Sequence, residues 1–124
     1  MTTLALLVAG GFGALARYEL GALVQRRAAT PRPWGTATVN LLGALGLGVL
    51  VALGRYDLVG EATVRALGVG FFGGFTTFST WMLESVLLAE EGRRSGKLSA
   101  LVNLGAQLLA GVGLTALIAV LTPG

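Results

Sequence analysis

Four long apolar segments dominate this sequence and leave little chain for anything else. The segments cover residues 4–24, 35–54, 62–89 and 98–121. Each reaches the length of about 20 residues that a helix needs to cross the hydrocarbon core of a bilayer. The loops between them are short and cover residues 25–34, 55–61 and 90–97. We therefore predict one all-α integral membrane domain of four transmembrane helices, formed by residues 1–124.

The composition favours lipid over water as the main solvent. Charged residues make up only 12% of the chain, about half the fraction of a soluble domain, and the mean hydropathy is +0.78. The chain has no cysteine and no histidine, which removes thiol chemistry, zinc sites and imidazole catalysis, so nothing supports an enzyme. The basic residues behind the net charge of +3 lie between apolar segments, which favours a role in membrane orientation over nucleic-acid binding.

The basic residues are distributed unevenly between the two sides of the predicted bundle. The first and third loops carry Arg26, Arg27, Arg32, Arg93, Arg94 and Lys97. The second loop and its edges carry only Arg55 and Arg65. Because cytoplasmic loops are enriched in Lys and Arg, this bias predicts that loops one and three face the cytoplasm. Both termini then lie on the outer side of the cell membrane.

Two polar residues inside the first two spans need an explanation, because a polar group in a bilayer is costly. Arg17 either extends to the interface or has a buried role, in which it is paired or supplies positive potential to an anion path. Asn40, in the second span, either bonds a neighbouring helix or offers its N–H groups to an anion.

The third segment is a poor continuous helix, because paired glycines and β-branched threonines disfavour helical structure. We predict that it breaks near Gly73–Thr76. A break at membrane depth frees backbone groups and is tolerated where they are buried or line a cavity. Freed carbonyls suit a hard cation such as Na⁺, and the hydroxyls of Thr77, Ser79 and Thr80 are candidates to solvate an ion. The alternative is a glycine kink satisfied by Ser and Thr side chains.

Two further patterns suggest the lining of an ion path. Phe78 and Trp81 share a helix face, which usually means packing, although positive ring edges also favour an anion. In the fourth span a polar row follows four-residue steps along one face. The row consists of Asn103, Gln107, Gly111 and Thr115. It indicates either a lining for water or an ion, or hydrogen bonds between helices.

The chain resembles the Fluc (CrcB) family of fluoride channels over essentially its full length. Three sequence blocks in the expected order and spacing carry the resemblance. They are GGFGALARY at residues 10–18, GTATVNLLG at residues 35–43, and GGFTTFSTW at residues 73–81, which Glu84 follows. The resemblance implies an antiparallel dimer with two pores that conducts fluoride passively and so relieves cytoplasmic fluoride toxicity.

The same resemblance implies roles for individual residues. A structural Na⁺ at the dimer centre would be bound by the backbone carbonyls of Gly73 and Thr76. Asn40 matches the pore asparagine, and Phe78 matches the first phenylalanine of an aromatic box. The polar track corresponds to Asn103, Gln107 and Thr115. The chain departs from the family at Trp81, where phenylalanine is usual, and at Gln107 and Gly111, where small hydroxyl residues are common.

Three alternatives remain open at this stage. The charge bias favours one fixed orientation, so the dimer is formed either with a second copy or with a homologous subunit of opposite orientation. A proton-coupled small multidrug exporter also has four short spans, and Glu19 and Glu84 are its candidate carboxylates. The third alternative is a non-conducting partner subunit of a heterodimeric fluoride channel.

Overall fold

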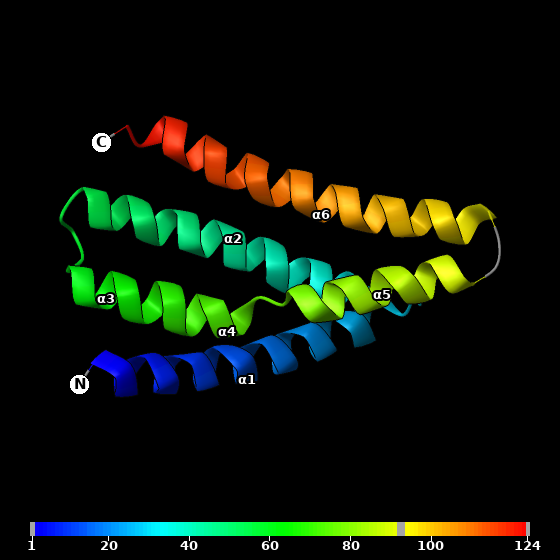
Figure 1. Cartoon of the computed structure of the whole chain (residues 1–124), viewed down its shortest axis with the longest axis horizontal. Coiled ribbons are helices and arrows are strands. Elements are labelled where there is room, and N and C mark those ends of the chain that lie inside the picture. Colours follow the sequence, from blue (N-terminus) through cyan, green and yellow to red (C-terminus); the bar gives the residue numbers. More distant parts are fainter. Residues whose placement is uncertain (1, 92–93, 124) are drawn as a thin grey trace.

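The computed structural model describes residues 2–91 and 94–123, and within them it is helical with no strand. Arg93, one of the basic residues of the third loop, lies outside the described residues. The first helices are α1 (Thr2–Ala28), α2 (Trp34–Arg55) and α3 (Glu61–Arg65). A π-helical stretch (Ala66–Phe72), α4 (Gly73–Phe75), α5 (Phe78–Glu90) and α6 (Arg94–Leu121) follow. All the helices run roughly along the long axis of the molecule (Figure 1).

The prediction of an all-helical membrane protein is confirmed. Three of the four predicted spans are single helices long and apolar enough to cross a membrane, at Thr3–Ala28, Trp34–Arg55 and Arg94–Leu121. The remaining span consists of consecutive helical pieces between Glu61 and Glu90. The start of α1, the end of α6 and the second loop lie at one end, and the first loop, the end of α5 and the start of α6 lie toward the other (Figure 1).

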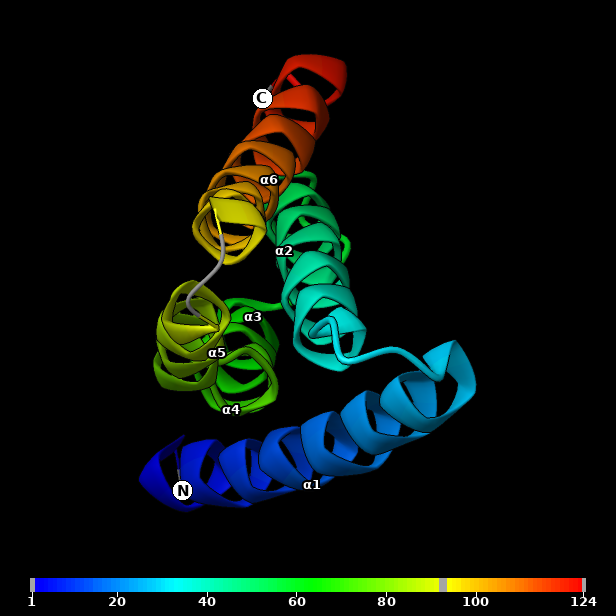
Figure 2. The ribbon, with the colours of Figure 1, turned by 90° about the vertical axis from the view of Figure 1, so that its right-hand side faces the viewer.

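The end-on view shows how the four spans pack. α2 lies between α1 and α6, while α5 lies beside α6 and the first part of the third span lies beside α1 (Figure 2). The fully buried core is small, and Val39 on α2 is its most buried large side chain, at 1% exposure. Large apolar side chains are exposed along the outer helices, as at Leu7 of α1 (69%) and Leu109 of α6 (75%). Such a surface suits lipid or a second subunit.

The first loop is held by one side chain. Ala29 adopts a positive φ of 48° directly after α1, and Pro31 and Pro33 cannot continue a helix. Gln25 donates from Nε2 to the carbonyls of Thr30 (2.7 Å) and Arg32 (2.9 Å). Its Oε1 accepts the N–H of Gly35 at 3.1 Å, which ties the end of α1 to the start of α2.

α1 and the third span approach at backbone distance through glycines. A Cβ atom built on Gly74 would overlap the carbonyl oxygen of Gly10, and one on Gly13 would overlap that of Phe71. Small residues permit such close approach of helices in lipid. This contact holds the residues around Gly74 in a helix immediately before the break.

The third span is broken, and the break lies at the late end of the predicted Gly73–Thr76. Gly73 and Gly74 are helical, and the extended residues are Thr76 (φ −86°, ψ 160°) and Thr77 (φ −145°, ψ 123°). The reason is that α1 packs against the glycines, whereas Thr77 is a good N-cap. Its Oγ1 accepts the N–H of Thr80 at 3.3 Å and so starts α5.

Candidate functional site

Asn40 forms hydrogen bonds with the extended residue at the break in the third span. Its Nδ2 donates to the carbonyl of Thr77 at 3.0 Å, and its Oδ1 accepts the N–H of Thr77 at 2.9 Å. One side chain of α2 therefore satisfies both backbone groups of the extended residue. This arrangement matches the requirement that backbone groups at membrane depth find partners inside the protein.

The break releases four carbonyl groups from helical pairing, those of Gly73, Gly74, Phe75 and Thr76. In a continuous helix the N–H of Thr77 would donate to Gly73, and that of Thr80 would donate to Thr76. Here these N–H groups donate to Asn40 Oδ1 and to Thr77 Oγ1 instead. The released groups include the carbonyls of Gly73 and Thr76, which the family resemblance implies as ligands of Na⁺. Carbonyl oxygens suit a hard cation, so these residues fit that ligand.

A chain of hydrogen bonds runs from Asn40 across α6 to α5. Asn40 Nδ2 donates to Gln107 Oε1 (3.0 Å), and Gln107 Nε2 donates to Asn103 Oδ1 (2.8 Å). Asn103 Nδ2 donates to Ser85 Oγ (2.9 Å), whose hydroxyl donates to the carbonyl of Trp81 (2.8 Å). The polar row of the fourth span therefore connects three helices. Ser85 is a member that sequence reasoning did not single out.

The two aromatic residues of the predicted box are in edge-to-face contact. The rings of Phe78 and Trp81 are 5.8 Å apart at an interplanar angle of 85°. Phe78 is 69% exposed. The indole N–H of Trp81 donates to the backbone carbonyl of Asn103 at 3.1 Å, so this donor is already occupied.

A groove of about 740 Å³ lies between α2, the broken span and α6. Eight of the predicted site residues line it, namely Asn40, Gly73, Thr76, Thr77, Phe78, Trp81, Gln107 and Thr115. Thr115 is exposed, and its hydroxyl donates to Gly111 of its own helix at 3.0 Å. Ser79 is exposed and does not line the groove.

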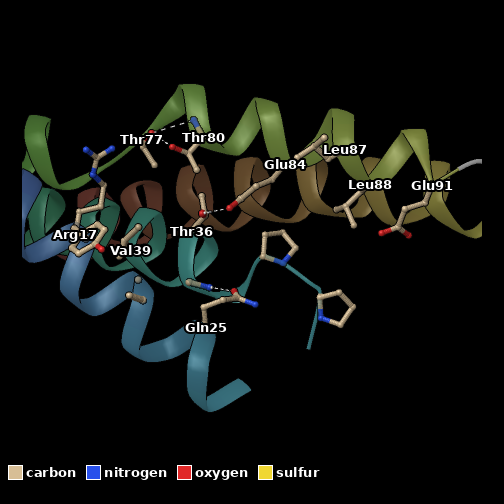
Figure 3. Close-up of a pocket in the computed structure, with 16 residues that line it drawn as sticks. Arg17, Gln25, Thr36, Val39, Thr77, Thr80, Glu84, Leu87, Leu88 and Glu91 are labelled. Carbon is tan, nitrogen blue, oxygen red and sulfur yellow. Dashed lines mark hydrogen bonds between the residues drawn. The ribbon is translucent and has the colours of Figure 1, made fainter. Parts of the chain in front are cut away.

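A second cavity, of about 550 Å³, lies on the other side of the break between α1, α2 and α5 (Figure 3). Arg17, Thr36, Thr80 and Glu84 line it, and Thr77 lines both this cavity and the groove. Within the described part of the chain the only salt bridge joins Glu61 to Arg65. Arg17 thus lines the cavity without an ion-pair partner among these residues.

Glu84 makes a contact in this cavity that its sequence context did not indicate. Its Oε1 accepts the hydroxyl of Thr36 at 2.7 Å (Figure 3). Its Oε2 is buried and has no hydrogen-bond partner among the described residues. In the sequence, Glu84 could be noticed as a carboxyl group within an apolar segment. Thr36, 48 positions earlier, carried no comparable signal.

Comparison with known proteins shows the family to which the chain belongs. The family described as "CrcB-like protein, Camphor Resistance (CrcB)" matches residues 4–120. A protein of Rubrobacter xylanophilus is 45% identical over 78% of this chain and 76% of its own length. One of Symbiobacterium thermophilum is 47% identical over 88% of this chain and 86% of its own. One of Thermobifida fusca is 46% identical over 91% and 88%.

Each of these three relatives is named "Fluoride-specific ion channel FluC 1". The match extends over nearly all of the chain, and it includes the three sequence blocks around Arg17, Asn40 and the break. The family resemblance expected from those blocks is confirmed, and the chain is a member of the CrcB-like family of membrane proteins.

Proposed function

We propose that this chain is the subunit of a fluoride-specific channel that lets fluoride leave the cytoplasm passively and so reduces fluoride toxicity. One observation carries the proposal: Asn40 holds Thr77 at the break, and Thr77 lines two cavities on opposite sides of it. A passive path through the membrane needs such cavities in series. The choice of fluoride as the ion rests on the names of the relatives.

The chemistry of the groove suits an anion without trapping it. Its lining is largely apolar, with a few amides, hydroxyls and aromatic rings and no Lys or Arg. Ring edges carry partial positive charge, and amide N–H groups donate to anions. The second cavity contains the positive charge of Arg17 together with the carboxyl groups of Glu84 and Glu91. Binding has to stay weak enough for the ion to leave.

The groove argues for a dimer. It is wide and it opens along α6, where apolar side chains such as Leu108 and Val112 are exposed. A second subunit of opposite orientation would cover this face and turn each groove into a closed path. Gly73 and Thr76, whose carbonyls have lost their helical donors, also line it. A structural Na⁺ bound there by both subunits would neutralise these dipoles and fix the two breaks together.

The partner is either a second copy of this chain or a homologous subunit inserted the other way. The excess of basic residues in the first and third loops favours a fixed orientation in the cell membrane, with those loops cytoplasmic and both termini outside. This favours the heterodimer, whereas a self-paired antiparallel dimer requires equal insertion both ways. Labelling of cysteines introduced at each terminus distinguishes the two, and equal labelling from both sides would rule out the fixed orientation.

The main experiment measures fluoride efflux from liposomes that contain this chain alone, with a fluoride electrode and with chloride as the control ion. Fast, fluoride-selective efflux supports a homodimeric channel. If this chain by itself gives no efflux, but efflux appears when a homologous subunit is added, the result supports the heterodimer. This chain is then a non-conducting partner when it is alone. Absence of efflux in both cases contradicts the proposed function.

One observation favours a second candidate, a proton-coupled small multidrug exporter. Such a mechanism needs a membrane carboxylate, and Glu84 has a buried oxygen without a partner. Under this alternative, transport needs a proton gradient and stops in Glu84→Gln. Fluoride efflux that is unaffected by collapse of the proton gradient would exclude it.

A further inference from the structure

A third cavity, of about 340 Å³, lies between α2 and α6 toward the first-loop end of the molecule. We call it the crevice. Arg32, Trp34 and Ser99 line it near the first loop, and its lining continues along α6 as far as Ala110. Most of that lining is apolar, so the crevice combines a polar mouth with an apolar interior.

The charge at the mouth of the crevice is not opposed by an acidic residue. Arg32 is the only charged residue among those that line it, and its side chain is exposed. Arg32 has no salt-bridge partner among the described residues. By contrast, Arg17 in the 550 Å³ cavity is accompanied by Glu84 and Glu91, and the groove contains no Lys or Arg. Of these three cavities, the crevice is therefore the one with an unopposed positive charge.

The length of the crevice matches one leaflet of a bilayer. Its lining on α6 runs from Leu98 to Ala110, which at 1.5 Å per residue is about 18 Å. Half of the hydrocarbon core is about 15 Å thick. Trp34 at the mouth is 49% exposed, and tryptophan is enriched at the level of the lipid headgroups. The crevice therefore extends from the headgroups into the hydrocarbon, as a lipid acyl chain does.

The crevice and the groove use different faces of α2. Ala37 and Leu41 line the crevice. Asn40 and Gly43, which line the groove, point in other directions because successive residues of a helix turn by about 100°. Gln107 is the one residue that lines both spaces. A second subunit that covers the groove therefore leaves the crevice to lipid.

We propose that the crevice binds one anionic phospholipid, with the lipid phosphate beside Arg32 and an acyl chain along Leu41, Val102 and Ala106. A guanidinium group suits a phosphate because two of its N–H groups donate in parallel. The hydroxyl of Ser99 is a further donor at the same end. The predicted orientation of the first loop assigns this lipid to the cytoplasmic leaflet. The site does not depend on conduction, so it stands apart from the proposed channel function.

The test is native mass spectrometry of the full chain in detergent, with phosphatidylglycerol or phosphatidylcholine of identical acyl chains added. We expect severalfold more bound phosphatidylglycerol than phosphatidylcholine. Inorganic phosphate should not displace the lipid, because the acyl chain contributes to its binding. Equal binding of the two lipids would show only general lipid contact, and displacement by inorganic phosphate would show a site for a soluble anion. Either result would overturn the proposal.

A pair of arginine variants tests the mouth of the crevice. Arg32→Gln removes its charge, and we expect the binding of phosphatidylglycerol to fall about fivefold, the effect of one basic residue beside an anionic lipid. Arg27→Gln is the matched control, because Arg27 is exposed at the end of α1 and does not line the crevice. An equal fall in both variants would indicate a diffuse basic surface and contradict a defined site.

A second pair of variants tests the apolar interior. Ala106→Leu fills the crevice, and the fold should accept the larger side chain because Ala106 is exposed. We expect it to lower the binding of both lipids severalfold without a change in melting temperature. Ala5→Leu makes the same replacement at an exposed position of α1 outside the crevice and should retain full binding. Undiminished phosphatidylglycerol binding in Ala106→Leu would show that no acyl chain lies in the crevice.

Discussion

Asn40 and Thr77 form a reciprocal pair in which a side-chain amide bonds both backbone groups of one residue, at 3.0 and 2.9 Å. The pair joins α2 to the point where the third span is extended. It leaves the carbonyls of Gly73 and Thr76 without their helical donors. The break in the third span is therefore held in place by a specific tertiary contact with α2.

Removal of the Asn40 amide should destabilise the protein. Asn40→Leu leaves the N–H and carbonyl of Thr77 without partners inside the membrane, and we expect a loss of about 2–4 kcal/mol in the free energy of unfolding. Chemical unfolding in detergent micelles measures it. Thr115→Val is the control, because the Thr115 hydroxyl is exposed and bonds only its own helix. Equal stability of the two variants would refute the structural role of Asn40.

The glycine contact between α1 and the third span can be tested with a pair of variants on one helix. Gly13→Ala places a Cβ against the carbonyl of Phe71, whereas a Cβ on Gly11 meets no atom within 4 Å. We expect Gly13→Ala to cost about 1–3 kcal/mol through overpacking and Gly11→Ala to be neutral or slightly stabilising. Thermal unfolding measures both, and a reversed order would be inconsistent with the close approach of the helices.

The bond between Thr36 and Glu84 should contribute to stability. Thr36→Val removes the hydroxyl that donates to Glu84 Oε1, and Oε2 has no partner among the described residues. Loss of a hydrogen bond to such a carboxyl group should cost about 1–3 kcal/mol. Thr36→Ser keeps the hydroxyl and should retain most of the stability. Equal melting temperatures of the Val and Ser variants would show that the bond contributes nothing.

Arg17 should act on fluoride flux through its electric potential. Arg17→Gln removes the positive charge from the cavity at α1, and we expect fluoride efflux to fall severalfold at low ionic strength. Added inert salt screens charges over about 10 Å at 0.1 M, so the difference from wild type should shrink as salt rises. Arg27→Gln, at the exposed end of α1, is the control. An effect of Arg17→Gln that does not depend on salt would point to packing instead.

Sodium should stabilise the proposed dimer. When the protein is purified and reconstituted with potassium as the only alkali cation, we expect a smaller dimer fraction, because the proposed site would hold the larger ion less well. Single-molecule subunit counting in liposomes measures the fraction. Readdition of sodium should restore it. An unchanged dimer fraction in the absence of sodium would remove Na⁺ from the proposal.

The sequence alone was sufficient to predict the membrane spans and the interruption of the third one. Both depend on local properties: the length of apolar segments, and the weak helix preference of paired glycines followed by threonines. The same local reasoning placed the start of the break slightly too early. It took Gly73 and Gly74 as the weak point, and these residues stay helical because α1 packs against them.

The tertiary structure alone decided which polar groups meet. Asn40 and Gln107 are 67 positions apart, and Thr36 and Glu84 are 48 apart. Nothing in the local sequence indicates that these pairs lie within hydrogen-bond distance, because the crossing of the helices brings them together. The sequence could identify Asn40 and Gln107 as polar residues that needed partners inside the membrane. Only the packing of α2, α5 and α6 determined that Asn40 bonds both Thr77 and Gln107.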